Sequence, residues 1–235
     1  MKFISLSNFP GTTGQYYYTS LFGYYGIDAT YTPIGTYDLK KSINNALDDN
    51  VAGISISMPF KKEIIHYLDN ADSAVIEYES CNTVKIQDGK LYGYNCDLAG
   101  VEHVSKTVTG SITILGNGAT GQMFEHYLRK TGHTDINVYS RNLNWNDRHA
   151  EADTVINCTP YGTANAESPL DFLPKDVKIV IDMSVKKGLL SEQCININYV
   201  HGAEFYKHQF LKQFESYIGI KPELTIYEKF ENIRI

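Results

Sequence analysis

The stretch SITILGNGATGQMFEHYLRKTG, residues 111–132, decides the fold class of this 235-residue chain. Its first residues form an apolar run that predicts a buried strand, and the later apolar residues recur at helical spacing. Between them stand Gly116, Gly118 and Gly121, in the G-x-G-x-x-G order. The first glycine permits a tight turn, the second lets the backbone approach a pyrophosphate, and the third lets the helix pack against the strand. The stretch therefore predicts a dinucleotide-binding unit, with a glycine-rich turn that binds nothing as the alternative.

The next strand, INVYS, ends at Ser140-Arg141. A dinucleotide-binding fold that prefers NAD places an acidic residue at about this point, for the ribose 2′-hydroxyl. A guanidinium there can pair with the 2′-phosphate of NADP and stack on adenine. The sequence therefore favours NADP over NAD, and a solvated arginine after a strand end is the simpler alternative.

The connection that follows is short. Residues 141–151 lead directly to the next expected strand in ADTVINCTP, where a full nucleotide-binding half would need another helix and strand. We expect a trimmed Rossmann domain that lacks an edge element.

The first hundred residues predict a second α/β unit. Strands are expected in KFISLS, ATYTPI and VAGISIS, a loop at residues 8–15, and helices at 16–26 and 37–49, which gives a βαβαβ order with parallel strands. A helix is expected over 62–80, a hairpin with Asp88-Gly89 at its turn over 81–95, and a helix over 97–108. The fold class is therefore α/β with two domains, a mostly parallel N-terminal sheet and the trimmed Rossmann domain.

Composition narrows the function. The net charge of −6 and the absence of a dense Lys/Arg run argue against a nucleic-acid partner. The four cysteines show no C-x-x-C spacing, which fits free thiols in a reducing compartment, and the seven histidines show no metal-ligand spacing. No signal peptide and no membrane-spanning run is recognised. We expect a cytoplasmic protein with a small-molecule substrate, no metal and no membrane partner.

Eight segments together resemble the shikimate dehydrogenase family, the NADP-dependent enzymes that reduce 3-dehydroshikimate, and their quinate-using relatives. In chain order, they are SISMPFKKE, SCNTV, GYNCDLAG, ILGNGATG, YSR, VINCTPYG, IDMSVKKG and GAEFYKHQF. The resemblance implies a substrate-binding and catalytic domain of residues 1–99 plus 204–235. A Rossmann-like NADP-binding domain of residues 100–203 would lie between these segments in the chain.

The resemblance implies that Lys61 and Asp97 form the catalytic pair. Oxidation of a secondary alcohol moves a hydride to the nicotinamide and the hydroxyl proton to a base. A lysine of ordinary pKa, about 10.4, is a poor base at neutral pH, so its pocket must lower that pKa or use the ammonium as a hydrogen-bonding acid. The sequence leaves both protonation states open. Lys62 is expected to face solvent.

The resemblance also implies the residues that bind substrate and cofactor. The substrate-binding residues are Thr13, Gln15, Ser57, Asn82 and Gln209. The cofactor-binding residues are Gly116, Asn117, Gly118, Ala119, Thr120, Gly121, Ser140, Arg141, Thr159, Met183 and Gly202. For Asn82 the alternative is a turn amide that satisfies backbone groups, and for Gln209 it is an exposed residue on the closing helix.

Departures from the family leave the substrate open. An early S-x-S pair that grips the substrate carboxylate is replaced by Thr13 and Gln15, and Val185 stands where the family has tyrosine. Unpaired buried partners cost about 1–3 kcal/mol, enough to shift specificity. The leading function is NADP-dependent interconversion of shikimate and 3-dehydroshikimate, or of a close cyclic polyol acid, by a monomer or homodimer. A related enzyme with a different substrate and a non-catalytic NADP- or metabolite-binding protein are the alternatives.

Overall fold

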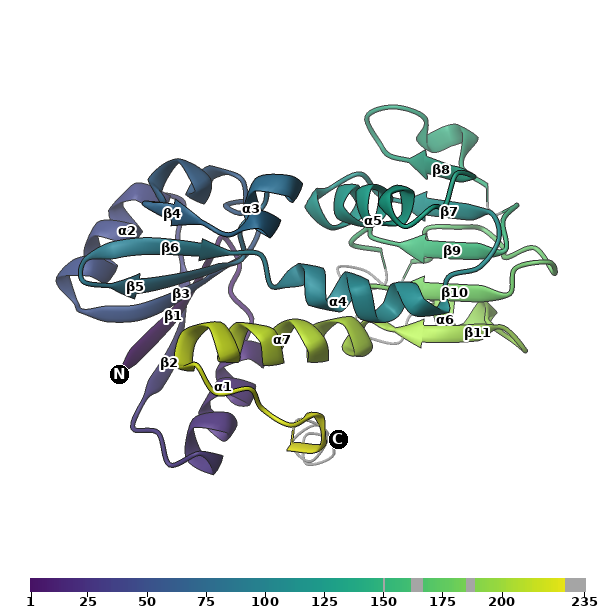
Figure 1. Ribbon diagram of the computed structural model, residues 1–235. Coiled ribbons are helices and arrows are strands. Elements are labelled where there is room, and N and C mark those ends of the chain that lie inside the picture. Colours follow the sequence, from purple (N-terminus) through teal and green to yellow (C-terminus); the bar gives the residue numbers. More distant parts are fainter. Residues whose placement is uncertain (150, 162–166, 185–188, 227–235) are drawn as a thin grey trace. The chain divides into compact units, whose positions relative to one another are not determined.

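The computed structural model describes residues 1–149, 151–161, 167–184 and 189–226, which fold into two compact units. Met1–Cys96 and Gln209–Ile235 form the first unit, and Asp97–His208 form the second (Figure 1). Each unit is built on its own β-sheet. The expected α/β class with two domains is confirmed.

The sheet of the first unit has six strands in the order β2-β1-β3-β5-β6-β4. They are β1 (Lys2–Ser7), β2 (Thr30–Gly35), β3 (Val51–Ile56), β4 (Asn70–Ala71), β5 (Thr83–Gln87) and β6 (Lys90–Tyr94). Strand β1 pairs in parallel with β2 and β3, as does β4 with β6, while β5 pairs antiparallel with β3 and β6. The hairpin turn falls at Asp88-Gly89, both with positive φ, as the sequence predicts.

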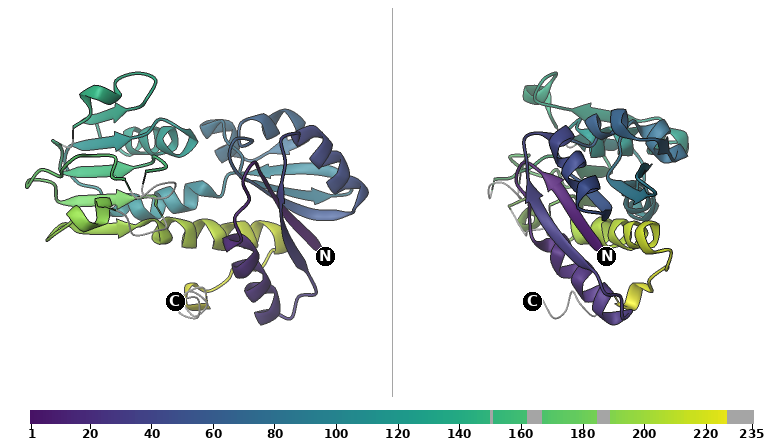
Figure 2. Two further views of the ribbon diagram at one scale, coloured as in Figure 1. Left: turned by 180° about the vertical axis from the view of Figure 1, so that it is seen from behind. Right: turned by 90° about the vertical axis from the view of Figure 1, so that its left-hand side faces the viewer.

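Helices cover both faces of this sheet, as Figure 2 also shows. On one face, α1 (Thr13–Tyr24) and the second half of α7 (Gly202–Ile218) bury an aromatic cluster that includes Phe3, Tyr18 and Phe214. On the other face, α2 (Leu39–Asp48) packs Leu39 and Ile43 against the strands. No helix in the described part of the chain is long and apolar enough to cross a membrane.

Two expected elements of the first unit differ in the structure. Helix α1 begins at Thr13, inside the expected loop, and the expected helix over 62–80 is wrong. That segment forms a 3-10 turn, η1 (Glu63–Tyr67), then β4 and the short helix α3 (Ser73–Tyr78). Asp69 explains the break, because its backbone N–H donates to Leu91 O at 2.9 Å and its carboxylate accepts from Leu91 N at 2.8 Å. Pairing with β6 therefore outweighs the local helical pattern.

The sheet of the second unit has five strands, all parallel, in the order β11-β10-β9-β7-β8. They are β7 (Ile112–Leu115), β8 (Ile136–Tyr139), β9 (Thr154–Asn157), β10 (Ile179–Asp182) and β11 (Asn198–His201). The helical elements are α4 (Asp97–Val104), η2 (Ser105–Thr107), α5 (Ala119–Lys130), η3 (Trp145–Asp147), α6 (Leu189–Gln193) and the start of α7.

Strand β8 is the edge of this sheet. In a six-stranded nucleotide-binding sheet of order 3-2-1-4-5-6, β7 takes position 1 and β8 position 2, so a third strand would lie beyond β8. Among the residues described between β8 and β9, only the 3-10 turn η3 is regular structure. The trimmed Rossmann domain is therefore confirmed.

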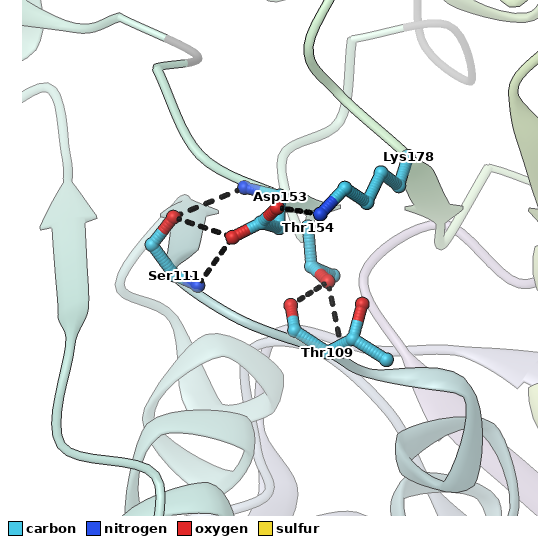
Figure 3. Close-up of polar contacts among 5 residues, drawn as sticks. All are labelled: Thr109, Ser111, Asp153, Thr154 and Lys178. Carbon is cyan, nitrogen blue, oxygen red and sulfur yellow. Dashed lines mark hydrogen bonds and ion pairs between the residues drawn. The ribbon is translucent and has the colours of Figure 1, made fainter.

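A polar cluster joins the amino-terminal ends of β7, β9 and β10 (Figure 3). The carboxylate of Asp153 accepts from Ser111 N at 3.0 Å and pairs with Lys178 Nζ at 2.5 Å. The Thr154 hydroxyl accepts from Thr109 N and donates to Thr109 O. The lysine and the serine donors hold the pKa of Asp153 below its usual range. This cluster fixes the end of the sheet opposite the glycine-rich turn.

Candidate functional site

The turn that carries Lys61 is tied by its backbone to the start of β5. Ile56, the last residue of β3, donates its N–H to Asn82 O at 2.8 Å. Past the turn, Lys61 O accepts from Cys81 N at 2.8 Å. Two backbone bonds therefore hold the lysine turn beside the segment that precedes β5.

The two neighbouring lysines differ in exposure. Lys61 is partly buried, whereas Lys62, which precedes η1, is exposed. Ser57 lies at the beginning of the turn, is exposed, and accepts from Phe60 N through its carbonyl at 2.9 Å. These exposures fit the prediction that the two lysines have different roles.

The side chain of Asn82 is 3% exposed and its amide is held in one orientation. Its Oδ1 accepts from Thr83 Oγ1 at 2.7 Å and from Cys96 N at 2.9 Å. Because both bonds are made by donors, the oxygen end of the amide faces Thr83 and Cys96. The bond from Cys96 N is the kind of backbone contact that the alternative of a turn amide expects, so a substrate-binding role for Asn82 stays a prediction.

Gln209 lies on α7 and is buried, which overturns the alternative of an exposed glutamine on the closing helix. Its Nε2 donates to Oε1 of Gln213, one helical turn further along, at 3.2 Å. Gln213 in turn donates to Asn82 O at 3.1 Å. Asn82 and Gln209 therefore share one hydrogen-bond partner, Gln213, within the first unit.

Thr13 and Gln15 stand in the first turn of α1. Thr13 is partly buried and Gln15 is exposed. One turn further along, Tyr18 is fully buried and its hydroxyl donates to Gln213 Oε1. The helix that carries Thr13 and Gln15 is therefore joined to α7 through Gln213.

Asp97 begins α4 and is counted with the second unit. It is 3% exposed. Burial, and after it the negative charge of Asp97, raise the pKa of the Tyr206 hydroxyl on α7 to about 12. Lys61 belongs to the first unit, so its pairing with Asp97 stays a prediction.

The glycine-rich turn between β7 and α5 has the geometry that its sequence predicts. Gly116 has a φ of 100°, which favours glycine, and a Cβ at Gly121 would overlap Gly116 O. Among the described residues, no atom lies within 4 Å of a Cβ built at Gly118. The N-cap residue of α5 is Gly118, which makes no side-chain cap bond, so the first N–H groups of the helix and the positive end of its dipole face the turn. Asn117 Oδ1 is buried there without a hydrogen-bond partner among the described residues.

The other expected cofactor residues follow the carboxyl ends of the neighbouring strands. Ser140 and Arg141 follow β8, Thr159 follows β9, Met183 follows β10 and Gly202 follows β11. All five strands are parallel, so these residues lie along one edge of the sheet, where open α/β folds bind ligands.

Contacts between backbone segments hold parts of this edge together. A Cβ at Gly116 would lie 3.2 Å from Thr159 Cγ2, and one at Gly202 would lie 2.8 Å from Met183 O. Asn157 orients Thr159, because its Oδ1 accepts from Thr159 N at 3.0 Å and Oγ1 at 2.6 Å. Its amide nitrogen donates to Asp182 Oδ1 at 2.9 Å.

Arg141 is exposed at the end of β8. The turn beneath it is fixed by Asn144, whose Oδ1 accepts from Ser140 N at 3.1 Å and whose Nδ2 donates to Val138 O at 3.0 Å. Arg141 therefore belongs to a turn that hydrogen bonds hold in place, beside the candidate cofactor edge. Val185 lies outside the described residues.

Among the described residues, one group of metal-binding side chains comes together: His103, Glu204 and His208, with ligand atoms within 4.8 Å of one another. The two imidazole rings stack, with centroids 3.6 Å apart and planes inclined by 21°. A metal ion lies in the plane of each imidazole that binds it, so these rings do not converge on one ion. Glu204 also pairs with Lys207 at 3.0 Å.

Sequence reasoning did not identify the residues that support the candidate site. These are Tyr18, Thr83, Asn157, Asp182 and Gln213. One signal was available, because Gln209 and Gln213 are four residues apart and so share one face of a helix. The others needed the tertiary structure, because each makes a bond to a residue distant in the sequence.

Comparison with known proteins gives a consistent match. A family model described as the shikimate dehydrogenase substrate binding domain matches residues 15–84. The shikimate dehydrogenase (NADP(+)) of Pyrococcus abyssi is 24% identical over 237 residues, covering 90% of this chain and 89% of that protein. The enzyme of the same name from Aquifex aeolicus is 31% identical over 187 residues, covering 77% of this chain and 65% of that protein.

A solved structure agrees in fold. The structure of shikimate 5-dehydrogenase from Thermus thermophilus in complex with NADP(H) and shikimate matches with a TM-score of 0.84 and 18% identity. The match covers 100% of both chains. At this identity, the likeness shows a shared fold across the full length of both proteins.

Proposed function

The chain belongs to the shikimate dehydrogenase family, and we propose that it is an NADP-dependent oxidoreductase that interconverts shikimate and 3-dehydroshikimate. Relatives named shikimate dehydrogenase (NADP(+)) match most of the chain, which supports both the reaction and the cofactor. A close cyclic polyol acid is the related substrate that the departures at Thr13 and Gln15 leave open.

The first unit supplies the substrate-binding residues in this proposal. Asn82 and Gln209 hydrogen-bond ring hydroxyls, and Thr13 and Gln15 at the start of α1 bind the carboxylate. Ser57 offers a further hydroxyl beside the Lys61 turn. The buried, oriented amides of Asn82 and Gln209 support this role, because a fixed amide loses little entropy when it binds a hydroxyl.

Lys61 and Asp97 transfer the proton. In the oxidation of shikimate, Lys61 accepts the proton of the reacting hydroxyl, and in the reverse reaction its ammonium returns that proton. Asp97 orients the lysine and contacts the same hydroxyl. The partly buried Lys61, held by a turn that two backbone bonds fix, supports this assignment over Lys62.

The second unit binds NADP along the carboxyl edge of its sheet. The residues fit the cofactor, because the open space at Gly118, the uncapped start of α5 and the unpartnered Asn117 Oδ1 suit a pyrophosphate and its ribose. Arg141 on its ordered turn suits the 2′-phosphate. When bound, the nicotinamide accepts or supplies the hydride.

The observation that carries the proposal is the combination of this glycine-rich turn with the oriented Asn82 and Gln209 amides, in a chain of which 90% matches a protein named shikimate dehydrogenase (NADP(+)). The test is the change in absorbance at the NADPH band when purified protein is mixed with NADP+ and either shikimate or quinate. We expect turnover with shikimate, faster with NADP+ than with NAD+.

The outcomes separate three functions. Turnover with quinate or another cyclic polyol alone assigns a different substrate to the same chemistry. Binding of NADP+ without turnover of any such acid contradicts an enzymatic role. The division into functional domains near residues 99 and 204, a cytoplasmic location, and a monomeric or homodimeric state stay predictions.

A further inference from the structure

Gln213 uses every hydrogen-bonding position of its amide inside the first unit, where it is 2% exposed. Its Nε2 donates to Asn82 O at 3.1 Å and to Thr83 Oγ1 at 2.7 Å. Its Oε1 accepts from the Tyr18 hydroxyl and from Gln209 Nε2. A primary amide has two donors and two acceptor lone pairs, so all four are used.

Thr83 links the amide of Gln213 to the side chain of Asn82. Its hydroxyl oxygen accepts from Gln213, which leaves the hydroxyl hydrogen for Asn82 Oδ1, 2.7 Å away. Cys96 N donates to the same oxygen. The oxygen and nitrogen ends of an amide have nearly the same shape, so bonds of this kind decide which end faces a ligand. Here the bonds from Thr83 and Cys96 direct the Oδ1 of Asn82 toward these two residues, so the NH2 group is at the opposite end of the amide.

The same residue sets the opposite polarity in Gln209. The Nε2 of Gln209 donates to Gln213 Oε1, so the inward end of this amide is its nitrogen. Its oxygen is at the other end. A ligand hydroxyl can both accept and donate. A polyol can therefore accept from Asn82 through one hydroxyl and donate to Gln209 through the same or another hydroxyl.

We propose that Gln213 is a positioning residue that, directly and through Thr83, fixes Asn82 as a hydrogen-bond donor and Gln209 as an acceptor toward the hydroxyls of the substrate. The inference rests on the proposed function, in which both amides bind a hydroxylated cyclic acid. Gln213 itself does not touch the substrate. If the network were merely structural, a substitution in it would lower the stability of the fold but leave the affinity for the substrate unchanged.

Thr83 offers the sharpest test, because Thr83→Val keeps the shape and removes the hydroxyl, whereas Thr83→Ser keeps the hydroxyl. We expect Thr83→Val and Gln213→Met each to raise KM for shikimate about tenfold, the factor lost with one hydrogen bond. The KM for NADP+ should stay unchanged, because the candidate cofactor edge lies in the second unit. Thr83→Ser should restore the KM for shikimate.

Phe214→Leu is the matched control. Phe214 is the next residue on α7, is fully buried in the aromatic cluster, and has no part in the polar network. The substitution should lower the stability of the first unit without changing KM for shikimate. An equal rise in KM for Phe214→Leu and Thr83→Val, or no rescue by Thr83→Ser, overturns the proposal.

A measurement without substrate separates this proposal from the proposed function. The side-chain NH2 resonances of Asn82, assigned by their loss in Asn82→Asp, are recorded by NMR in the unliganded protein. We expect them to shift in Thr83→Val and Gln213→Met and to return in Thr83→Ser. Unchanged resonances in Thr83→Val overturn the proposed orientation whether or not the protein turns over shikimate. Shifted resonances without any turnover contradict the proposed function alone.

Discussion

Single residues differ in exposure even where they are adjacent in the sequence. Lys61 and Lys62 have the same chemistry, but the turn after β3 leaves the first partly buried and the second exposed. The amides of Asn82 and Gln209 are oriented by the neighbouring residues Thr83 and Gln213, and these two residues are joined to each other across 130 positions of the sequence. Exposure and hydrogen-bond partners therefore separate a candidate site residue from its neighbours.

Replacement of the two lysines tests this difference. We expect Lys61→Ala to lower kcat with shikimate by about 10²–10⁴-fold, because the substitution removes the side chain that accepts and returns the proton of the reacting hydroxyl. Lys62→Ala should change kcat by less than about twofold, since this side chain faces solvent. Steady-state kinetics measure both, and circular dichroism checks that both variants fold. Similar small effects from the two substitutions would rule out Lys61 as the acid-base group.

Replacement of Arg141 tests the choice of cofactor. Arg141→Gln should raise KM for NADP+ about 10- to 100-fold, the range for loss of a charge-assisted hydrogen bond to a phosphate. The KM for NAD+, which lacks the 2′-phosphate, should change little. Arg129→Gln, an exposed arginine on α5, is the control and should leave both values unchanged. An equal rise for both cofactors after Arg141→Gln would contradict a 2′-phosphate contact.

Elements are held by backbone contacts that only certain residues allow. The turn between β7 and α5 closes because Gly121 brings the helix against Gly116 O. Helix α7 brings Glu204 and His208 into the second unit and Gln209 and Gln213 into the first. One helix therefore supports two sets of contacts, and its substitutions test them separately.

A pair of glycine substitutions separates packing from ligand binding. Gly121→Ala should destabilise the second unit by about 1–3 kcal/mol, because the added methyl overlaps Gly116 O and the backbone must shift. Gly118→Ala should change stability by less than about 0.5 kcal/mol, since nothing lies within 4 Å of the new Cβ, but weaken NADP+ binding by occupying that space. Trp145, the single tryptophan, reports unfolding of the second unit by fluorescence. Equal stability of the two variants would contradict the close approach at Gly121.

We expect the stacked histidines, His103 and His208, to make the second unit less stable in acid. Burial lowers the pKa of His103 and lowers the pKa of His208 to about 4. Lys106 and Lys207 also lower both pKa values, whereas the negative charge of Glu204 raises them. An unfolded histidine has a pKa of about 6.5, so between pH about 6.5 and 4 the unfolded chain binds a proton that folded His208 does not. Stability should therefore fall as the pH falls through this window.

The measurement is urea unfolding followed by Trp145 fluorescence at pH 7 and pH 5. His208→Gln should show a smaller loss of stability between these two pH values than the unsubstituted protein. His126→Gln, at an exposed site on α5, should show the same loss as the unsubstituted protein. An unchanged pH dependence in His208→Gln would exclude this histidine as its source.

At the scale of the whole molecule, the proposed binding residues for the two ligands belong to different units. The candidate substrate-binding residues all lie in the first unit, and the candidate cofactor residues all lie in the second. Each unit has its own sheet and its own hydrophobic core. Each proposed ligand should therefore stabilise mainly its own unit.

Hydrogen exchange measured by mass spectrometry tests this assignment. At a concentration 100 times its dissociation constant, a ligand stabilises the state that binds it by about 2.7 kcal/mol. NADP+ alone should slow exchange in β7, β9 and α5 more than in β1 and β3. Shikimate alone should show the reverse pattern. Protection of β1 and β3 by NADP+ alone, with β7 unchanged, would contradict the assignment of the cofactor to the second unit.

Local sequence determined much of this protein. The glycine spacing predicts the turn at 116–121, because a positive φ and a close backbone approach favour glycine. Asp88-Gly89 predicts its hairpin, because Asp and Gly both tolerate the positive φ of a two-residue turn. The short connection after Arg141 predicts the missing edge strand. These signals depend on neighbouring residues alone. The resemblance to a known family, in contrast, identified Lys61, Asn82 and Asp97 as candidate site residues, which no local rule singles out.

Only the tertiary structure decided the rest. Residues 62–80 have a helical pattern, but Asp69 pairs with Leu91, and the hydrogen bonds of a sheet edge outweigh a weak local preference. Gln213 on α7 became central because its partners Tyr18 and Thr83 come from α1 and β5, which lie far from it in the sequence. Short-range patterns predict which residues form a turn or a strand, whereas the orientation of a buried amide depends on donors and acceptors that only folding brings within reach.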